Sequence, residues 1–289
     1  MMLKETYRLA NGNEIPKLGF GTWMIDNQDA AKAVQEAIQV GYRHIDTAQA
    51  YKNEAGVGEG IRNSGIAREE IFLTTKLAAE IKDYAGAVAA IDGSLEKLGL
   101  DYIDLMIIHS PKPWAEFQSD ADHFFEGNLE AWKALEEAYQ AGKIHAIGVS
   151  NFEQVDLENL LENGTIKPMV NQILAHIGYT PFDVIAFSQQ NGILVEAYSP
   201  IAHGEMMRSA EITNMAEKYG VSIPQLAIRY LLQLDLLPLP KTLNKAHMEN
   251  NADVDFEISS EDMETLKELK KLDYGKNTDI PVFRRATDQ

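Results

Sequence analysis

Residues 29–54 read DAAKAVQEAIQVGYRHIDTAQAYKNE, a pattern that predicts a helix followed by a short strand. The helical part places its apolar side chains on one face, at Ala30, Ala33, Val34, Ala37 and Ile38. The strand that follows Gly41 ends on a carboxylate, Asp46, and Tyr51 comes five residues later. A core strand has no need of either residue, so this segment raises a question of function as well as of fold.

The same alternation of strand and helix occurs eight times along the chain. The predicted strands are 18–22, 43–46, 71–76, 104–109, 144–151, 168–172, 193–199 and 236–242. The predicted helices are 29–40, 53–64, 84–98, 128–141, 152–163, 181–191, 222–234 and 245–251. Strongly apolar strands that alternate with amphipathic helices predict a (β/α)8 TIM barrel, which needs about 250 residues. A doubly wound open sheet is the alternative.

Four segments lie outside this alternation. Asn11-Gly12-Asn13 predicts the turn of an N-terminal β-hairpin cap. Two additional helices are expected at 209–220 and at 259–272, the second with Ser259 or Ser260 as its N-cap. Segment 111–128 is long for a barrel loop and is either a lid or a loop packed on the outside. No linker divides the chain, so we expect 1–289 to form one domain.

The composition of the chain argues against several classes of function. A net charge of −18 argues against nucleic-acid binding, and no run approaches the roughly 18 apolar residues of a membrane span. The chain has no cysteine, and its seven histidines show no ligand spacing, so we expect no metal site and no oxidising compartment. These observations favour a cytoplasmic protein that acts on a small molecule.

The ends of the predicted strands carry polar side chains. Asp46, Lys76 and His109 end three consecutive strands, and Tyr51 follows the first of them. Each has an ordinary explanation by itself: a helix cap, a solvated lysine, a structural histidine. Together they indicate an active site, because the strands of a barrel lie about 4.8 Å apart and present their carboxyl ends at one mouth.

A tyrosine beside a lysine and an aspartate has the chemistry of a tuned acid. A free phenol has a pKa of about 10. We expect the Lys76 ammonium to lower the pKa of Tyr51 toward neutrality, and Asp46 to keep Lys76 charged. Such a tyrosine can protonate a carbonyl oxygen as a hydride arrives, while His109 orients the same oxygen.

Beyond this chemistry, the chain resembles the aldo-keto reductase family, and within it the bacterial, 2,5-diketo-gluconate reductase-like type that uses NADPH. The resemblance rests on GYRHIDTA (41–48) with Tyr51, Glu54 and Gly58, and on five further motifs in order. These are GFGTW (19–23), GVSNF (148–152), NQ (171–172), AYSP (197–200) and PKT (240–242).

This resemblance implies a set of site residues. The catalytic residues would be Asp46, Tyr51, Lys76 and His109, with Tyr51 as general acid. Tyr198 would stack on the nicotinamide of NADPH, whose other contacts would be Gly21, Thr22, Trp23, Asp46, Ser150, Asn151, Gln172, Ser199, Pro200, Ile201, Lys241, Thr242, His247, Asn250 and Asn251. The substrate would meet Trp23, Tyr51, His109 and Trp114.

Several positions depart from the family pattern. His247 stands where an arginine commonly binds the adenosine phosphate, which implies NADPH use with weaker discrimination against NADH. Only the second of Asn250 and Asn251 matches the usual adenine contacts. His145 replaces a basic residue and is expected beside the cofactor. Ser110 replaces a tryptophan, so we expect a roomier pocket that Trp114 partly fills. The C-terminal tail, with Phe283 as its one aromatic residue, is a further candidate for the substrate wall.

Together these features predict a monomeric enzyme that reduces aldehydes or ketones with NADPH. The sequence leaves its substrate open among sugar-derived diketones, dicarbonyls, aromatic aldehydes and keto esters. A catalytically weak nucleotide-binding regulatory or structural protein on the same barrel is the second hypothesis.

Overall fold

The computed structural model describes residues 2–288, which are built around eight parallel strands. The strands are β3 (Phe20–Gly21), β4 (His44–Asp46), β5 (Phe72–Leu77), β6 (Leu105–Ile108), β7 (Ile147–Ser150), β8 (Val170–Leu174), β9 (Leu194–Tyr198) and β10 (Leu237–Leu239). They pair in chain order from β3 to β10. The Gly19 amide donates to the Pro238 carbonyl oxygen (3.1 Å) and the Gly21 amide to that of Pro240 (2.9 Å), which joins the last strand to the first. The barrel is therefore closed, and the open-sheet alternative is wrong.

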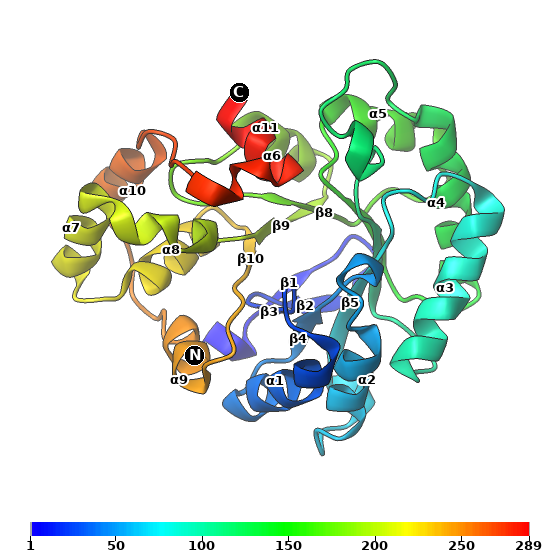
Figure 1. The fold of residues 1–289 in the computed structure, drawn as a ribbon, viewed down its shortest axis with the longest axis horizontal. Helices are drawn as coiled ribbons and strands as arrows, with labels where there is room; N and C mark the ends of the chain where they lie inside the picture. The colour runs from blue at the N-terminus through cyan, green and yellow to red at the C-terminus, as the bar shows by residue number, and fades with distance from the viewer. Residues whose placement is uncertain (1, 289) are drawn as a thin grey trace.

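Eight helices follow the eight strands and surround them, as Figure 1 shows. They are α1 (Asn27–Val40), α2 (Glu54–Arg62), α3 (Tyr84–Leu98), α4 (Phe125–Gln140), α5 (Gln154–Asn163), α6 (Phe182–Gln190), α8 (Ile223–Leu232) and α9 (Lys245–Ala252). The predicted apolar face of α1 is confirmed, because the five residues assigned to that face are the ones that the helix buries. The eight pairs of strand and helix predicted from the sequence are thus the eight pairs that form the barrel.

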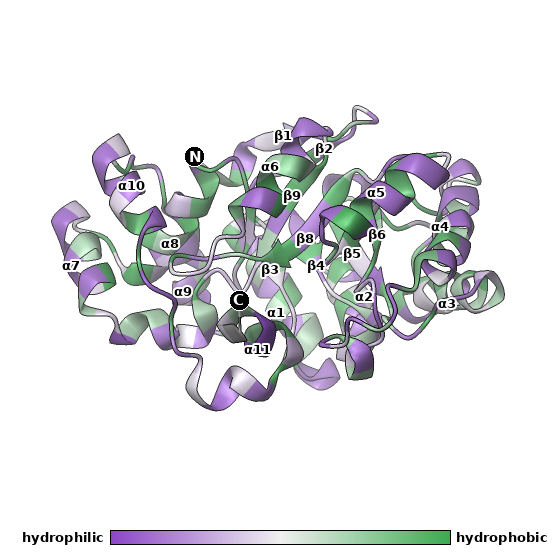
Figure 2. Ribbon diagram, turned by 90° about the horizontal axis from the view of Figure 1, so that it is seen from above, coloured by the Kyte–Doolittle hydropathy of each residue, from purple (hydrophilic) through white to green (hydrophobic). Residues whose placement is uncertain are grey.

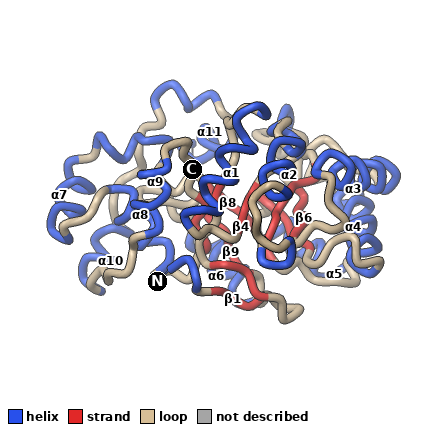
Figure 3. The backbone as a smooth tube through the Cα atoms, turned by 90° about the horizontal axis from the view of Figure 1, so that it is seen from below, coloured by secondary structure: helices blue, strands red, loops and turns tan. Residues whose placement is uncertain are grey.

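The core lies between the helices and the strands, and within the barrel itself. Figure 2 shows apolar strands at the centre and most of the polar residues on the outer faces of the helices. In Figure 3 the strands are likewise enclosed by helices. Strands covered on every side can carry an inward polar side chain only where it finds partners, so each such residue is a candidate for function.

A two-stranded hairpin closes the end of the barrel at which the strands begin. Its strands, β1 (Thr6–Arg8) and β2 (Glu14–Pro16), are antiparallel, as predicted. The side-chain amides of Asn11 and Asn13 both donate to the carbonyl oxygen of His145 at 2.9 Å. His145 also stacks on Tyr102, with ring centroids 4.2 Å apart. It precedes β7 at this closed end, so the expectation that it lies beside the cofactor is wrong.

Three additional α-helices, rather than two, accompany the barrel in residues 2–288. The expected pair is present as α7 (Ala210–Tyr219) and α10 (Ser260–Lys267), and Ser259 caps α10 by accepting from the Asp262 amide. The third is α11 (Pro281–Asp288), where the sequence suggested only a tail. Eight residues are too few for a stable isolated helix, and the buried ring of Phe283 fastens α11 to the rest of the protein.

Candidate active site

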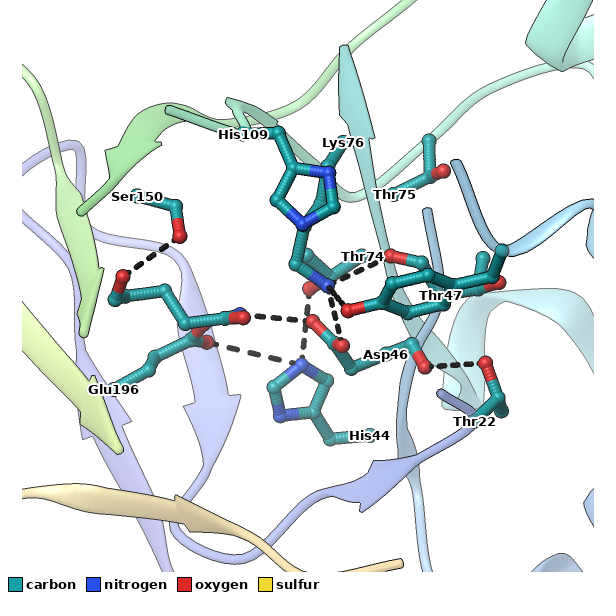
Figure 4. A network of polar contacts seen from close by, with 12 residues as sticks. Thr22, His44, Asp46, Thr47, Thr74, Thr75, Lys76, His109, Ser150 and Glu196 are labelled. Atoms are coloured by element: carbon teal, nitrogen blue, oxygen red, sulfur yellow. Dashed lines mark hydrogen bonds and ion pairs between the residues drawn. The ribbon is translucent and has the colours of Figure 1, made fainter. Parts of the chain in front are cut away.

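The carboxyl ends of β4, β5 and β6 bring three polar side chains together. Lys76, near the end of β5, places its Nζ 2.5 Å from Oδ1 of Asp46, the last residue of β4. The same nitrogen donates to the Thr47 carbonyl oxygen (2.9 Å) and to the Tyr51 hydroxyl (3.2 Å). Figure 4 shows Lys76 and Asp46 pointing toward one another in this network. Lys76 thus connects a carboxylate to a phenol.

Tyr51 is held over this pair by the loop after β4. A short 3-10 helix, η2 (Gln49–Tyr51), turns the chain back toward the barrel. The side chain of Gln49 fastens the turn, because its oxygen accepts from the Ala78 amide (2.8 Å) and its nitrogen donates to Ser94 Oγ (2.9 Å). The five residues from Asp46 to Tyr51 are therefore enough for the chain to turn back and place the Tyr51 hydroxyl beside Lys76.

Burial and charge act in opposite directions on the pKa values of this group. Burial disfavours the charged form of Lys76, but Asp46 and Tyr51 together raise the pKa of Lys76 above its ordinary value. Burial raises the pKa of Tyr51, and the attraction of Lys76 offsets this only in part. The expectation that the pKa of Tyr51 falls toward neutrality is therefore wrong. Tyr51 carries its proton at neutral pH, which is the form that a general acid needs.

His109, directly after β6, completes the site as a neutral imidazole. Burial, with the charges of Lys76 and Lys82, holds the pKa of His109 well below its ordinary value. Its ring lies edge-on to Tyr51 (centroids 5.7 Å apart) and to Trp114 (5.2 Å). Its Nδ1 has no hydrogen-bond partner within the described part of the chain. A neutral imidazole can donate a hydrogen bond without competing with Tyr51 as the acid.

These side chains open into a cavity of about 560 Å³ at the same mouth of the barrel. The predicted residues that line it are Trp23, Tyr51, His109, Trp114, Ser150, Asn151, Gln172, Tyr198, Ser199, Pro200, Ile201 and Lys241. Its size and its largely apolar wall, with a few convergent polar groups, are typical of a small-molecule site. Asp46 and Lys76 lie behind this wall, and their network reaches the cavity through Tyr51, which is bonded to Lys76, and through Gln172, which is bonded to Asp46.

Hydrogen bonds connect the polar groups of the wall to one another. The Tyr198 hydroxyl donates to Asn151 Oδ1 (2.7 Å), and the Asn151 amide donates to the His109 carbonyl oxygen (3.0 Å). Ser150 Oγ donates to the backbone oxygen of Gln172 (2.7 Å). β7, β8 and β9 are thus cross-linked at the positions where the resemblance places the nicotinamide.

Other predicted cofactor residues lie outside the lining of the cavity. Gly21 belongs to the seam that closes the barrel, and the Thr22 hydroxyl donates to the Asp46 carbonyl oxygen (2.9 Å). Asn250 Oδ1 accepts from the hydroxyl of Ser222 (2.7 Å). The remaining three lie beyond Lys241 along the chain: Thr242 is half-buried, His247 is exposed and Asn251 is buried. Their contacts with a cofactor stay predictions.

The loop 111–128 lies at the mouth and not on the outside of the barrel. Its short 3-10 helix η4 (Trp114–Glu116) places Trp114 against His109, and Phe117 packs on Trp114 with centroids 5.4 Å apart. Gln118 donates to the carbonyl oxygen of Pro281 in α11. Trp114 thus belongs to the cavity wall; whether the loop moves as a lid stays a prediction.

The C-terminal tail joins the cavity wall, as expected, but not through Phe283. Ile280, Pro281 and Val282 line the cavity, whereas the ring of Phe283 is buried against Tyr274 and His203.

One further group at the site was not predicted from the sequence. Glu196 is fully buried beneath the wall, beside Gln172. Its signal was available, because ILVEAYS places one carboxyl group inside an otherwise apolar strand.

Between residues 2 and 288, no three His, Asp or Glu side chains are grouped so that they could hold a metal ion. Over the same range, no helix combines the length and apolar character required to cross a bilayer.

The chain is similar to known carbonyl reductases. Residues 17–271 match the aldo/keto reductase family. The glyoxal reductase of Bacillus subtilis (strain 168) is 42% identical over 284 residues, which are 97% of this chain and 99% of that protein. The methylglyoxal reductase DkgA of Escherichia coli (strain K12) is 39% identical over 272 residues, which are 93% of this chain and 94% of that protein. A solved structure of Bombyx mori aldo-keto reductase in complex with NADP has a TM-score of 0.82 and 34% identity, covering 96% of this chain and 98% of that one.

Proposed function

The chain belongs to the aldo/keto reductase family, and on this basis we propose that it reduces small aldehydes and ketones to alcohols with NADPH. One observation carries the proposal: Lys76 Nζ contacts both the Asp46 carboxylate and the Tyr51 hydroxyl beneath the cavity. A buried cation held by a carboxylate and placed on a phenol stabilises the tyrosinate that remains after proton transfer.

Each side chain then has one role. When bound, NADPH supplies the hydride that reduces the carbonyl carbon. Tyr51 donates its proton to the carbonyl oxygen, and Lys76 stabilises the resulting tyrosinate while Asp46 keeps Lys76 charged. His109 donates a hydrogen bond to the same oxygen, and Trp114 beside it restricts the space for the substrate.

The cavity wall fits a nicotinamide cofactor. Tyr198 presents an aromatic ring, and Ser150, Asn151 and Gln172 present the groups that would hold a carboxamide. At the cavity edge, Ser199, Ala202 and His203 have φ angles of 51°, 48° and 53°, so the backbone curls tightly. A curl of this kind directs amide groups toward one point, which suits a diphosphate. Lys241, farther along the lining, is the cation for the adenosine phosphate.

NADPH is expected to be preferred over NADH, with a kcat/KM ratio above one, and the preference should depend on Lys241. Replacing Lys241 by methionine removes the cation that pairs with the adenosine phosphate. We expect Lys241→Met to lower kcat/KM for NADPH about tenfold or more, and that for NADH less than about twofold. Steady-state kinetics with both cofactors gives the ratio.

Lys143→Met is the matched control for Lys241→Met, since Lys143 lies at the opposite end of the barrel and pairs with Asp92 (2.6 Å). It should leave both values unchanged. A wild-type ratio below one, or an equal loss with both cofactors in Lys241→Met, would contradict the assignment of the phosphate site.

The expected substrates are small dicarbonyls, of the kind named for the two curated relatives. The function is tested by following NADPH absorbance with glyoxal, methylglyoxal, sugar-derived diketones, aromatic aldehydes and keto esters. We expect turnover in this panel, with the small dicarbonyls among the best substrates. Binding of NADPH without turnover of any carbonyl would instead favour the second hypothesis, a nucleotide-binding regulatory or structural protein.

We further propose that the protein works as one domain over 1–289 and as a cytoplasmic monomer. One barrel carries a complete set of site residues, so a monomer could be active, and the cysteine-free composition suits the cytoplasm. Light scattering coupled to gel filtration measures the molar mass that a monomer requires.

A further inference from the structure

Glu196, at the centre of β9, is a buried carboxyl group directly behind the cavity wall. Its Oε2 accepts from Gln172 Nε2 at 2.7 Å, and the same nitrogen donates to Asp46 Oδ2 at 2.8 Å. Figure 4 shows Glu196 on the inner side of the sheet, facing Asp46 and His44. The two hydrogens of the Gln172 amide are therefore used inside the barrel. Only its oxygen remains free to meet a ligand in the cavity.

The surroundings of Glu196 favour its neutral form. Asp46 and His44 face it from β4 and Lys76 from β5, while its register partners on β8 and β10 are Gln172 and Leu237. Burial, and then the charge of Asp46, raise the pKa of Glu196 to about 8. The second oxygen, Oε1, accepts no hydrogen bond from any described residue. At pH 7 the carboxyl group is thus mostly protonated, and it ionises in mildly alkaline solution.

His44 does not supply a positive charge that would balance an ionised Glu196. Its Nε2 is 3.8 Å from Glu196 Oε1, and it is hydrogen-bonded to Thr74 Oγ1 at 2.9 Å. Burial, together with Lys76, lowers the pKa of His44 to about 3, so the imidazole stays neutral wherever Glu196 titrates. Ionisation of Glu196 therefore places an additional negative charge behind Gln172, with Lys76 already engaged by Asp46.

Glu196 and the cavity are close in the sheet. Tyr198, two residues farther along β9, lines the cavity, and residues two apart on a strand point to the same side. The nicotinamide of NADP⁺ carries a positive charge that the dihydronicotinamide of NADPH lacks. A negative charge behind Gln172 stabilises the oxidised form more than the reduced form.

We propose that Glu196 is a positioning residue that makes the relative affinity for NADP⁺ and NADPH depend on pH, its ionised form favouring NADP⁺. The proposal rests on the proposed function, since it assumes that the nicotinamide lies at the wall formed by Gln172 and Tyr198. Linkage makes the effect reciprocal, so binding of NADP⁺ also favours the release of the Glu196 proton.

The test compares dissociation constants of NADP⁺ and NADPH between pH 6.5 and 9.5, measured from the tryptophan fluorescence of the intact protein. In the wild type we expect the ratio Kd(NADP⁺)/Kd(NADPH) to fall about five- to tenfold as the pH rises through 8. In Glu196→Gln, whose amide oxygen can still accept from Gln172 and which has no proton to lose, this fall in the ratio around pH 8 should be absent.

Other titrating groups do not produce this difference. The adenosine phosphate occurs in both cofactors and cancels in the ratio. Lys82, whose pKa burial lowers to about 7, titrates equally in wild type and variant. A wild-type ratio independent of pH, or the same pH dependence in Glu196→Gln, would overturn the proposal.

A measurement on the wild type alone avoids any dependence on the folding of the variant. Calorimetric titration at pH 8, in two buffers of different ionisation enthalpy, reports the protons released on binding. We expect NADP⁺ to release about 0.3–0.4 proton more per site than NADPH. Equal release would refute the role of Glu196, whereas a protein that neither binds NADPH nor reduces carbonyls at pH 7 would refute the proposed function.

Discussion

Replacing Tyr51 by phenylalanine is expected to lower kcat for carbonyl reduction by about 10²- to 10⁴-fold, because the substrate oxygen loses its proton donor. Binding of NADPH should change less than about threefold, since an aromatic ring remains in the wall. The ion pair below is kept, because Lys76 still contacts Asp46 Oδ1 (2.5 Å) and the Thr47 carbonyl oxygen (2.9 Å). The variant thus separates chemistry from binding.

Two measurements on Tyr51→Phe test whether Tyr51 is the proton donor. NADPH absorbance gives the turnover, and quenching of tryptophan fluorescence gives the affinity, with Trp23 and Trp114 in the cavity wall as reporters. Tyr84→Phe is the matched control, because it removes a phenolic hydroxyl that is bonded to Glu137 (2.5 Å) at the surface. Near-normal turnover by Tyr51→Phe would remove Tyr51 from the role of acid.

Replacing Lys76 by methionine is expected to damage both activity and stability. Lys76 and Asp46 are both buried, with 1% and 5% of their side chains exposed. Removing the cation leaves the Asp46 carboxylate in the barrel with the Gln172 amide and no opposite charge. Breaking a buried ion pair in this way costs about 3–5 kcal/mol, and reduction should become almost undetectable. Equilibrium unfolding in urea measures the loss of stability.

A second substitution separates the two effects of Lys76→Met. In Asp46→Asn/Lys76→Met no charge is left unpaired, so most of the stability should return while the activity does not. The exposed pair Lys143–Asp92, 45% and 55% exposed, is the control, since Lys143→Met should cost less than about 1 kcal/mol. If Lys76→Met were as stable as the wild type, Asp46 would have to be protonated or hydrated.

Most of the barrel could be predicted from the sequence because its signals are local. Each strand is a short apolar run, and each helix keeps one apolar face, as α1 does with Ala30, Ala33, Val34, Ala37 and Ile38. The turn at Asn11-Gly12-Asn13 and the cap at Ser259 are equally local. The helix α11 was missed because its stability comes from Phe283, which packs against rings outside the helix, Tyr274 (centroids 4.6 Å apart) and the distant His203 (4.9 Å).

The sequence predicts the site residues that stand at strand ends. It does not predict properties that depend on how deeply a side chain is buried or on which distant segment covers it. Asp46, Lys76 and His109 could be aligned because a barrel presents its strand ends at one mouth. The predicted shift of the Tyr51 pKa had the wrong direction. The sequence shows that Lys76 is near Tyr51, but it does not show how completely the hydroxyl is buried from water. His145 was misplaced because the hairpin that covers it approaches from far along the chain.

The sequence by itself thus determined the strand–helix alternation, the family and the four polar side chains at the barrel mouth. All three are carried by residue types and short spacings, which need no knowledge of packing. Only the tertiary structure decided that Tyr51 keeps its proton, that Gln172 turns its amide inward, and that Glu196 lies uncharged behind it at neutral pH. Those properties depend on burial and on contacts between distant strands, such as the hydrogen bond between Gln172 and Asp46, which are 126 residues apart in the chain, so they exist only after the barrel has closed.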